Sequence, residues 1–409
     1  MKLFYRENYL KKIRGFYHTD DIIKVITGVR RCGKSSLMEM IASEIKESGV
    51  PKENIIFIDL DKRGFKGIKT TDALEKLIDE KSTSKGMKYL FIDEVQNVDG
   101  FEEVMNAYRT EGGYSIFITG SNSYLLSGEL ITKLTGRYLE FEMYPLSFEE
   151  YENMKAFYKI AVNPNPAVEL SDYIIEGGFP RAVLLPDLND KRKYVHGVVE
   201  EIIEKDIRRR IKIRNKDAFE TVMNYIINNF GATMSINNIC GALKANGNSI
   251  SKATVSRYIQ ALVDAKMLCE CKRFDMKSRK SLSGEQKYYL SDLSFYFARN
   301  TDNTINYGPV LENIIYIYAR SKDYSVSVGK IGNLECDFIL RSPDMNYSYV
   351  QVAFTIMQNK ETEDREYCAL EKIKDNYPKY VTTTDYIIQK RNGINHVNLI
   401  DFIKKDNLF

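Results

Sequence analysis

A nine-residue segment, GVRRCGKSS at residues 28–36, constrains what this chain can fold into more than any other feature. It follows the spacing G-x-x-x-x-G-K-[ST], with Gly28, Gly33, Lys34 and Ser35 at the defining positions. An apolar run precedes it and an amphipathic stretch follows it, as expected of a strand and a helix. Glycines let such a loop curve around an anion, while successive backbone N–H groups and the helix N-terminus face it. The sequence therefore predicts a phosphate-binding loop between a strand and a helix.

Short apolar runs alternate with amphipathic stretches up to about residue 150, which is the pattern of a βαβ domain. The runs are rich in Ile, Phe and Val and apolar on both faces, as buried parallel strands are. They are IIKVITG (22–28), NIIFIDL (54–60), KYLFIDE (88–94) and SIFITGS (115–121). The stretch after the loop places Leu37, Met40, Ile41 and Ile45 on one helical stripe. We expect an α/β domain with a parallel sheet, the architecture of a P-loop nucleoside triphosphatase.

The loop is expected to bind ATP together with Mg²⁺. Lys34 would reach the β- and γ-phosphates, and the Ser35 hydroxyl would be a ligand of Mg²⁺. The expected ATP-binding residues are Gly28, Arg30, Arg31, Cys32, Gly33, Lys34, Ser35 and Ser36. A glycine-rich turn with a chance lysine is the alternative, which the flanking strand and helix disfavour.

An acidic pair, Asp93 and Glu94, ends the third apolar run. Such a pair is common after strands, but behind a phosphate-binding loop it indicates a Walker B motif. Asp93 is then expected to hold Mg²⁺, directly or through water, and Glu94 to orient or polarise the water that attacks the γ-phosphate. Gln96, just beyond the pair, either reports the nucleotide state or merely caps a turn, and the sequence does not separate these roles.

Hydrolysis also calls for a sensor of the γ-phosphate and a cation for the transition state. Ser121 and Asn122 follow the fourth apolar run, where a sensor is found in ring-type ATPases, although a simple turn also explains them. Arg137 precedes a further strand, where a finger reaching a neighbouring copy could emerge. Arg109 and Arg181 are weaker candidates. A single arginine is more often part of a surface salt bridge, so that alternative stays open.

The overall composition is that of a globular protein with more than one domain. The chain has 409 residues, 44% hydrophobic and 28% charged, which is too long for one ordinary core. Lys and Arg total 59 against 56 Asp and Glu, so any DNA contact must come from a local patch. The start has no signal-peptide pattern, and no stretch approaches the roughly 20 apolar residues of a membrane span. We therefore expect a cytoplasmic protein without a membrane partner.

Several segments, in this order, resemble a family of bacterial and archaeal AAA-type ATPases whose C-terminal domain has no assigned function. The resemblance rests on GVRRCGKSS, FIDEVQ, ITGSNSYLLSGELITKLTGRYLEFEMYPLSFEEY and EGGFPRAV, and on later pieces such as SKATVSRYIQALVDAKML, ECDFIL and YVQVAF. It implies three modules: an AAA-like ATPase, a winged helix and a domain related to the PD-(D/E)xK nucleases. We accordingly expect the ATPase domain at residues 1–150, a helical lid or linker at 151–228, the winged helix at 229–292 and the nuclease-like domain at 303–409.

The expected winged helix offers a surface for duplex DNA. Ser251 would cap a helix whose outward face carries residue types that suit a major groove. The outward residues are Lys252, Thr254, Ser256, Arg257 and Gln260, and the inward ones are Val255, Ile259, Leu262, Val263 and Leu268. Upstream, the basic run EKDIRRRIKIRNK (204–216) could follow phosphates with a salt-sensitive affinity. Winged helices also dock proteins, and charge runs usually form solvated helix faces, so a protein partner is the alternative.

The C-terminal region departs from the nuclease pattern that the resemblance implies. Glu312, Asp337 and Gln351 stand where that fold has a helix carboxylate, a hairpin Asp and the Glu of a Glu-x-Lys strand. Here Gln replaces the Glu and Ala353 replaces the Lys, and an amide is a much poorer Mg²⁺ ligand than a carboxylate. We expect a nuclease-like fold without nuclease activity. A metal-dependent nuclease with a lysine borrowed from elsewhere is the weaker option.

Together these features predict a cytoplasmic AAA-like ATPase whose other two modules contact DNA. The alternative is a nucleotide-dependent switch that docks a protein partner through the winged helix, without DNA. A second copy of the chain is a further candidate partner, because an arginine finger can act between subunits.

Overall fold

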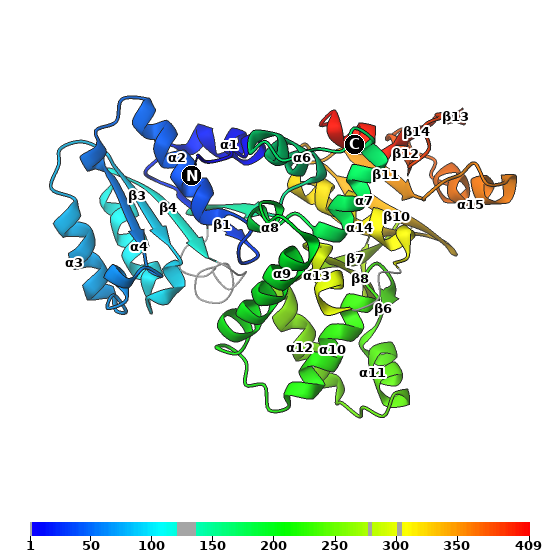
Figure 1. Cartoon of the computed structure of the whole chain (residues 1–409), viewed down its shortest axis with the longest axis horizontal. Coiled ribbons are helices and arrows are strands. Elements are labelled where there is room, and N and C mark those ends of the chain that lie inside the picture. The colour runs from blue at the N-terminus through cyan, green and yellow to red at the C-terminus, as the bar shows by residue number, and fades with distance from the viewer. Residues whose placement is uncertain (1, 121–135, 277–279, 301–304) are drawn as a thin grey trace. The chain divides into compact units, whose positions relative to one another are not determined.

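A computed structural model of the chain describes residues 2–120, 136–276, 280–300 and 305–409. These residues form two compact units, the first made of residues 1–143 and 264–266 and the second of residues 144–263 and 267–409 (Figure 1). Each unit has its own sheet. Within the described ranges, no helix has both the length and the apolar character that crossing a bilayer requires.

The first unit is built on a parallel sheet of five strands. Its elements are α1 (Glu7–Ile13), β1 (Ile23–Gly28), α2 (Lys34–Glu47), β2 (Ile55–Asp59), α3 (Thr71–Lys81), β3 (Lys88–Asp93), α4 (Phe101–Glu111), β4 (Tyr114–Gly120) and β5 (Tyr138–Met143). The strand order is β2-β3-β4-β1-β5, and every neighbouring pair is parallel. The four predicted strands and the α/β class are confirmed, and β5 adds a fifth strand beside β1.

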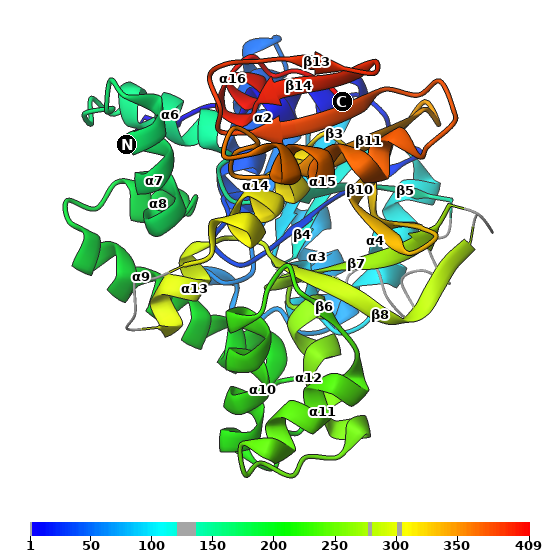
Figure 2. The ribbon, with the colours of Figure 1, turned by 90° about the vertical axis from the view of Figure 1, so that its right-hand side faces the viewer.

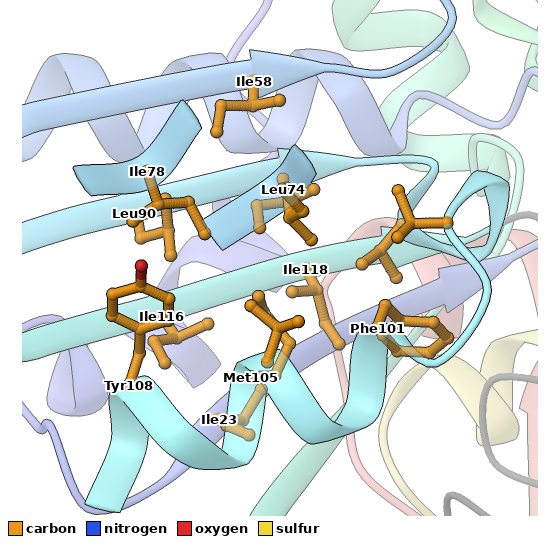
Figure 3. Packing of buried hydrophobic residues seen from close by; sticks show 14 of the residues in the cluster. Ile23, Ile58, Leu74, Ile78, Leu90, Phe101, Met105, Tyr108, Ile116 and Ile118 are labelled. Atoms are coloured by element: carbon orange, nitrogen blue, oxygen red, sulfur yellow. The ribbon is translucent and has the colours of Figure 1, made fainter. Parts of the chain in front are cut away.

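One face of this sheet packs against α3 and α4 (Figure 3). Buried Ile58, Leu90 and Ile118 come from three adjacent strands and lie in one cluster with Leu74 of α3 and Met105 of α4. Both the strands and the helices gain from this burial, because apolar surface removed from water contributes roughly 25 cal/mol per Å². This cluster is the apolar core that fixes the positions of the strand ends.

The other face of the sheet carries aromatic residues and is covered by α2. The rings of Phe91 and Phe117 stack with their centroids 4.7 Å apart, and Phe57 stacks on Phe91 at 5.7 Å. Helix α2 contacts β1, β3 and β4. The predicted stripe of Leu37, Met40, Ile41 and Ile45 is buried, so the amphipathic pattern orients the helix that follows the loop.

The second unit begins with a helical region. Its helices up to residue 228 are α6 (Phe148–Phe157), α7 (Pro166–Glu176), α8 (Pro180–Val183), α9 (Leu188–Ile202), a π-helical turn (Ile203–Ile207) and α10 (Lys216–Asn228). Helix α6 starts with a capping box, in which Ser147 accepts from the Glu150 N–H and the Glu150 side chain accepts from the Ser147 N–H.

A close approach of backbone and side chain explains the double glycine in EGGFPRA. A Cβ atom on Gly177 would lie 2.1 Å from Asp292 Oδ1, and one on Gly178 would lie 2.3 Å from Leu146 O. The Gly178 N–H donates to Asp292 Oδ2 at 2.7 Å, and the Leu146 N–H donates to Gly178 O at 2.7 Å. The glycines therefore let three distant segments of the second unit meet.

The remaining elements of the second unit are the nine strands of one sheet and the helices that connect or follow them. They are β6 (Thr233–Met234), α11 (Ile236–Ala245), α12 (Lys252–Asp264), β7 (Leu268–Asp275), β8 (Lys280–Leu290), α13 (Ser294–Arg299), α14 (Tyr307–Ser321), β9 (Ser325–Ile331), β10 (Leu334–Arg341), β11 (Tyr347–Val352), α15 (Lys360–Glu371), β12 (Lys379–Thr383), β13 (Lys390–Arg391), β14 (Ile394–Asn398) and α16 (Leu399–Lys404). The strand order is β13-β14-β12-β11-β10-β9-β7-β8-β6. Strand β7 pairs in parallel with β9, so the sheet is continuous between residues 229–292 and 303–409.

Helices α10, α11 and α12 form a cluster beside the hairpin of β7 and β8 (Figure 2). The rings of Phe219 in α10 and Tyr258 in α12 meet edge to face at 5.2 Å. The Thr254 N–H donates to Ser251 Oγ at 3.2 Å, which confirms the predicted cap of α12. Val255, Ile259 and Leu262 are buried as predicted. In the order α10-β6-α11-α12-β7-β8, three helices and one short strand thus precede a two-stranded hairpin.

Candidate functional site

The loop after β1 has the backbone shape that its glycines allow. Gly28 has φ 146°, and a Cβ atom there would lie 2.1 Å from Met143 O of the adjacent strand. Gly33 has φ 110° at the N-terminus of α2, and Arg31 also takes a left-handed conformation with φ 68°. A larger residue at Gly28 would clash with β5, and one at Gly33 would strain the backbone. The predicted loop therefore stands between β1 and α2, with the helix N-terminus at its end.

Lys34 is held against the loop rather than extended into solvent. It is 4% exposed, and its Nζ donates to Gly28 O at 2.9 Å and Val29 O at 3.1 Å. Two of the three N–H donors of the ammonium are thus used within the loop. Ser35 is exposed on the first turn of α2, whereas Arg30 and Cys32 are buried. The ammonium and the Ser35 hydroxyl both lie at the positive end of a helix, which favours an anion.

A residue far upstream also holds this loop. Arg6, just before α1, is 3% exposed, and its guanidinium donates to Cys32 O at 3.1 Å. The same guanidinium lies 4.6 Å from the centre of the Tyr9 ring. The sequence analysis missed Arg6, because nothing in the local pattern connects residue 6 with residue 32.

The acidic pair lies at the carboxyl end of β3, which pairs with β4, and β4 in turn pairs with β1. Thr119 of β4 joins the two acids: its hydroxyl donates to Asp93 Oδ1 and accepts from the Glu94 N–H at 3.1 Å. Asp93 is buried beneath this contact. The sequence analysis missed Thr119, although a hydroxyl among the buried positions of a largely apolar strand, next to its carboxyl end, was a usable signal.

Glu94 is in an unusual local environment. Its backbone is left-handed, with φ 55° and ψ 48°, which is uncommon for a residue other than glycine. Burial raises the pKa of its carboxyl group, and nearby Lys34 and Arg30 act in the opposite direction. Gln96 Nε2 donates to Glu94 Oε2. A carboxylate whose pKa is raised by burial is a stronger base and is better suited to accept a proton from water.

The other predicted catalytic residues lie in different places. Arg137, before β5, is exposed, and its guanidinium donates to Asn106 Oδ1 of α4 at 3.2 Å. Arg109 of α4 also donates to Asn106, and Arg181 of α8 is exposed in the second unit. Ser121 and Asn122 lie outside the described residues, so the predicted sensor has no structural description.

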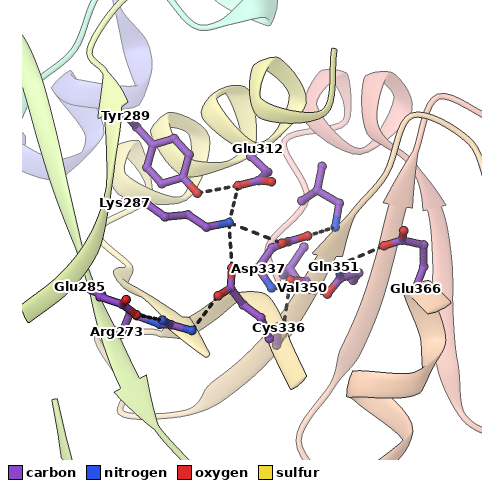
Figure 4. A network of polar contacts seen from close by, with 12 residues as sticks. Arg273, Glu285, Lys287, Tyr289, Glu312, Cys336, Asp337, Val350, Gln351 and Glu366 are labelled. Carbon is purple, nitrogen blue, oxygen red and sulfur yellow. Dashed lines mark hydrogen bonds and ion pairs between the residues drawn. The ribbon is translucent and has the colours of Figure 1, made fainter. Parts of the chain in front are cut away.

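A second group of carboxylates lies in the second unit around Lys287 of β8 (Figure 4). Lys287 Nζ lies 3.0 Å from Glu312 Oε2, 3.1 Å from Glu335 Oε1 and 3.8 Å from Asp337 Oδ1. Tyr289 Oη also donates to Glu312, at 2.7 Å. Burial lowers the pKa of Lys287, but the three carboxylates outweigh it and leave the pKa raised. The structure thus brings Glu312 and Asp337 together around a lysine that the sequence analysis did not identify.

Gln351, the third residue of the expected nuclease pattern, is hydrogen-bonded to the residues beside it. Its Oε1 accepts from the Asp337 N–H at 3.4 Å, and its Nε2 donates to Glu366 at 3.0 Å. Asp337 Oδ2 accepts from the Val352 N–H at 2.8 Å. Burial and the neighbouring Glu312 raise the pKa of Asp337 well above its usual range. Within the described ranges, no three His, Cys, Asp or Glu side chains are grouped as a metal ion would need.

Basic residues gather where the π-helical turn leads into α10. Arg208, Arg209, Arg210, Lys212, Arg214 and Lys216 are exposed. Arg208 pairs with Glu204 at 2.8 Å and Lys216 with Glu220 at 3.5 Å, and such exposed pairs are weak. On α12, Lys252, Ser256, Arg257 and Gln260 are exposed as predicted.

Two protein families match this chain. Residues 20–152 match a family described as an AAA domain. Residues 168–304 match a family described as a domain of unknown function (DUF8612). The first match covers the phosphate-binding loop, the acidic pair and all five strands of the parallel sheet.

Individual proteins match over most of their length. An uncharacterized protein of Haemophilus influenzae is 35% identical over 401 residues, which span 97% of this chain and 98% of that protein. Uncharacterized protein MJ1544 of Methanocaldococcus jannaschii is 31% identical over 366 residues, spanning 86% of this chain and 79% of that protein. Among solved structures, the Walker-type ATPase PABY2304 of Pyrococcus abyssi is similar in fold. The match spans 73% of this chain and 96% of the Pyrococcus abyssi chain, with 16% sequence identity and a TM-score of 0.51.

Proposed function

The chain belongs to the same protein family as the Haemophilus influenzae protein and MJ1544, with an AAA domain at residues 20–152, and we propose that it binds ATP with Mg²⁺ and hydrolyses it. One observation carries this proposal. A phosphate-binding loop with a buried lysine and an acidic pair held by Thr119 stand at the carboxyl ends of three adjacent parallel strands. In open α/β sheets, ligands bind at this edge.

Each residue has a chemical role in this proposal. The loop N–H groups and Lys34 bind the phosphates, and Ser35 and Asp93 hold Mg²⁺, a hard cation that prefers oxygen ligands. The metal ion would neutralise charge on the phosphate oxygens. Glu94 accepts a proton as water attacks the γ-phosphorus, and the bond to the bridging oxygen breaks to release ADP. Asn122, which lies outside the described residues, keeps its predicted role as the γ-phosphate sensor, and Arg137 acts on the site of a second copy of the chain.

We further propose that the second unit couples this cycle to duplex DNA. The series α10-β6-α11-α12-β7-β8 is the element order of a winged helix, and α12 would be its recognition helix. Its exposed Lys252 and Arg257 would contact DNA, and residues 208–216 would contact phosphates, because this segment leads into α10, which packs on α12. The expected nuclease-like fold of the C-terminal part would not cleave, since Lys287 and the Val352 N–H occupy oxygens that a metal ion would need.

The competing function is a nucleotide-dependent switch that docks a protein partner through the same helices. The exposed residues of α12 are both charged and uncharged, and they suit either kind of partner. Only residues 208–216, with six cations within nine residues, favour DNA over a protein. The test must therefore address this segment.

The experiment is steady-state ATP hydrolysis by the wild type, Lys34→Ala and Glu94→Gln, each with and without duplex DNA. Both substitutions should lower the rate at least about 100-fold, because each removes a group that acts on the transition state. A triple charge reversal, Arg208→Glu with Arg209→Glu and Arg210→Glu, should abolish stimulation by DNA. It should also make the slope of log K against log salt less steep by up to about 2.7.

A matched control reverses three exposed cations elsewhere in the second unit, Lys360, Lys372 and Lys374. This control should keep DNA binding and stimulation. Hydrolysis that is indifferent to DNA, with the triple reversal equal to the control, would support the protein-docking switch. A wild type that binds ATP but never hydrolyses it would refute the ATPase proposal itself.

A further inference from the structure

We propose that Gln96 is a positioning residue that holds the Glu94 carboxylate and, together with it, orients the attacking water. This inference rests on the proposed ATPase function. It gives a role to a residue for which the sequence left two interpretations open.

Gln96 lies on the short 3₁₀ turn Val95–Asn97 that follows Glu94 directly. The left-handed backbone of Glu94 turns the chain so that the two side chains face each other, and Gln96 Nε2 donates to Glu94 Oε2. Thr119 fixes the Glu94 backbone N–H and Asp93, whereas Gln96 contacts the carboxylate itself. The strained backbone and the two separate contacts hold one carboxylate in one orientation.

The chemistry of the two groups fixes which way the Gln96 amide points. An ionised carboxylate only accepts hydrogen bonds, so the amide nitrogen must face Glu94 and the carbonyl oxygen must face away. That oxygen, Oε1, is buried and has no hydrogen-bond partner among the described residues. Buried carbonyl oxygens without a donor are rare and costly, and they commonly mark the place of a water or a ligand.

A water molecule supplies the donor that this oxygen needs. One O–H of the water would point to Glu94 and the other to Gln96 Oε1, which leaves an oxygen lone pair for the γ-phosphorus. The water oxygen bonds to phosphorus, and the bond between phosphorus and the bridging oxygen breaks with its electron pair going to ADP. One water proton passes to Glu94, and the other stays on the inorganic phosphate. Gln96 gains and loses no proton, so it positions rather than reacts.

The test compares Gln96→Leu and Gln96→Glu with the wild type across a pH series. Gln96→Leu removes both hydrogen bonds. It should lower kcat about 10- to 100-fold, because a displacement of about 1 Å in a reacting geometry can cost about 100-fold, while KM for ATP changes less than about threefold. It should also move the acid limb of the kcat profile to higher pH, because the carboxylate loses a donor that favours its charged form. Gln96→Glu is nearly isosteric and puts a second carboxylate beside the first, so its acid limb should move further.

Two controls make the outcome decisive. Asn97→Leu changes a neighbour on the same turn whose amide donates to Asp61 at 3.0 Å, and it should keep the wild-type kcat and acid limb. The second control is a double-mutant cycle between Gln96→Leu and Glu94→Gln. It compares Tm values measured without nucleotide, so it does not depend on ATPase activity. The two Tm changes should be non-additive by a few degrees, because Gln96→Leu removes the contact that Glu94→Gln weakens by taking the charge from the acceptor.

The inference is overturned if both Gln96 variants keep the wild-type kcat and acid limb while Glu94→Gln is inactive. It is also overturned if Gln96→Leu lowers only Tm and the cycle is additive, which is the result of a simple turn cap. If Gln96→Leu does not fold, the isosteric Gln96→Glu still decides through its acid limb. A Glu94→Gln variant that hydrolyses ATP at the wild-type rate would instead refute the role proposed for Glu94, and this outcome differs from all the others.

Discussion

Two buried lysines, one in each unit, face opposite environments. Lys24 of β1 is fully buried, and its ammonium donates to Thr19 O at 2.7 Å, Ile22 O at 3.1 Å and Ser115 Oγ at 2.8 Å. It also lies 4.6 Å from the centre of the Phe117 ring. All of these partners are neutral. Lys287 of β8 is almost as deeply buried but is surrounded by three carboxylates.

The difference shows that neutral hydrogen bonds do not fully offset the free-energy cost of burying a charge. Burial lowers the pKa of Lys24 to about 7, because carbonyl and hydroxyl groups do not replace the solvation that water gives an ammonium. In Lys287 the attraction of the carboxylates exceeds the same effect of burial, so the pKa is raised. Lys287 therefore stays charged at neutral pH, whereas Lys24 is close to losing its proton. The same substitution at the two positions should therefore change different properties: the free energy of unfolding itself at Lys287, and its dependence on pH at Lys24.

The largest effect is expected for Lys287→Met. The substitution leaves buried Asp337 and the partly buried Glu312 and Glu335 without their shared cation, which should lower the free energy of unfolding by about 3–5 kcal/mol. Urea unfolding followed by circular dichroism measures this loss. Adding Glu312→Gln should recover part of it, because one uncompensated charge is then removed. A loss below about 1 kcal/mol would mean that the carboxylates are already protonated without Lys287.

A smaller effect is expected for Thr119→Val, which keeps the side-chain shape. It leaves Asp93 Oδ1 and the Glu94 N–H without their partner and should cost about 1–3 kcal/mol of stability. If the proposed function holds, kcat should also fall, because both acids lose their common anchor. Ser115→Ala is the matched control. It removes a buried hydroxyl at the opposite end of the same strand, which donates to Tyr17 O at 2.7 Å. Ser115→Ala should cost stability but keep kcat; equal losses of kcat in both variants would contradict the role of Thr119.

The smallest expected effect is the change in the free energy of unfolding with pH that Lys24 causes. A lysine whose pKa is lower in the folded state binds fewer protons there than in the unfolded chain, so stability rises with pH above about 7. The expected gain between pH 7 and pH 8 is about 1 kcal/mol, and it should be absent in Lys24→Met. Thermal or urea unfolding in matched buffers measures it. The Lys287→Met variant should keep the rise, since Lys287 does not titrate in this range. An identical slope in wild type and Lys24→Met would contradict the assignment to Lys24.

The predictions from sequence that the structure confirms depend on residues close together in the chain. The loop spacing of Gly28, Gly33 and Lys34 lies within seven residues, and the strands on either side are short apolar runs. The stripe of α2 and the cap of Ser251 follow from a helical period and from one hydroxyl near a helix start. Such patterns are read directly, because each one is set by the geometry of a single turn or strand.

The sequence by itself thus determined the P-loop, the acidic pair, the parallel strands, the stripe of α2 and the cap of α12. Only the tertiary structure decided what those elements face. It brought Arg6 to Cys32, Thr119 to Asp93, and Lys287 to Glu312, Glu335 and Asp337. It also joined β7 to β9, so that one sheet spans two expected modules. The physical reason is that a lysine in a strand has the same local pattern whether carbonyls or carboxylates surround it, and those partners come from strands and helices distant in sequence.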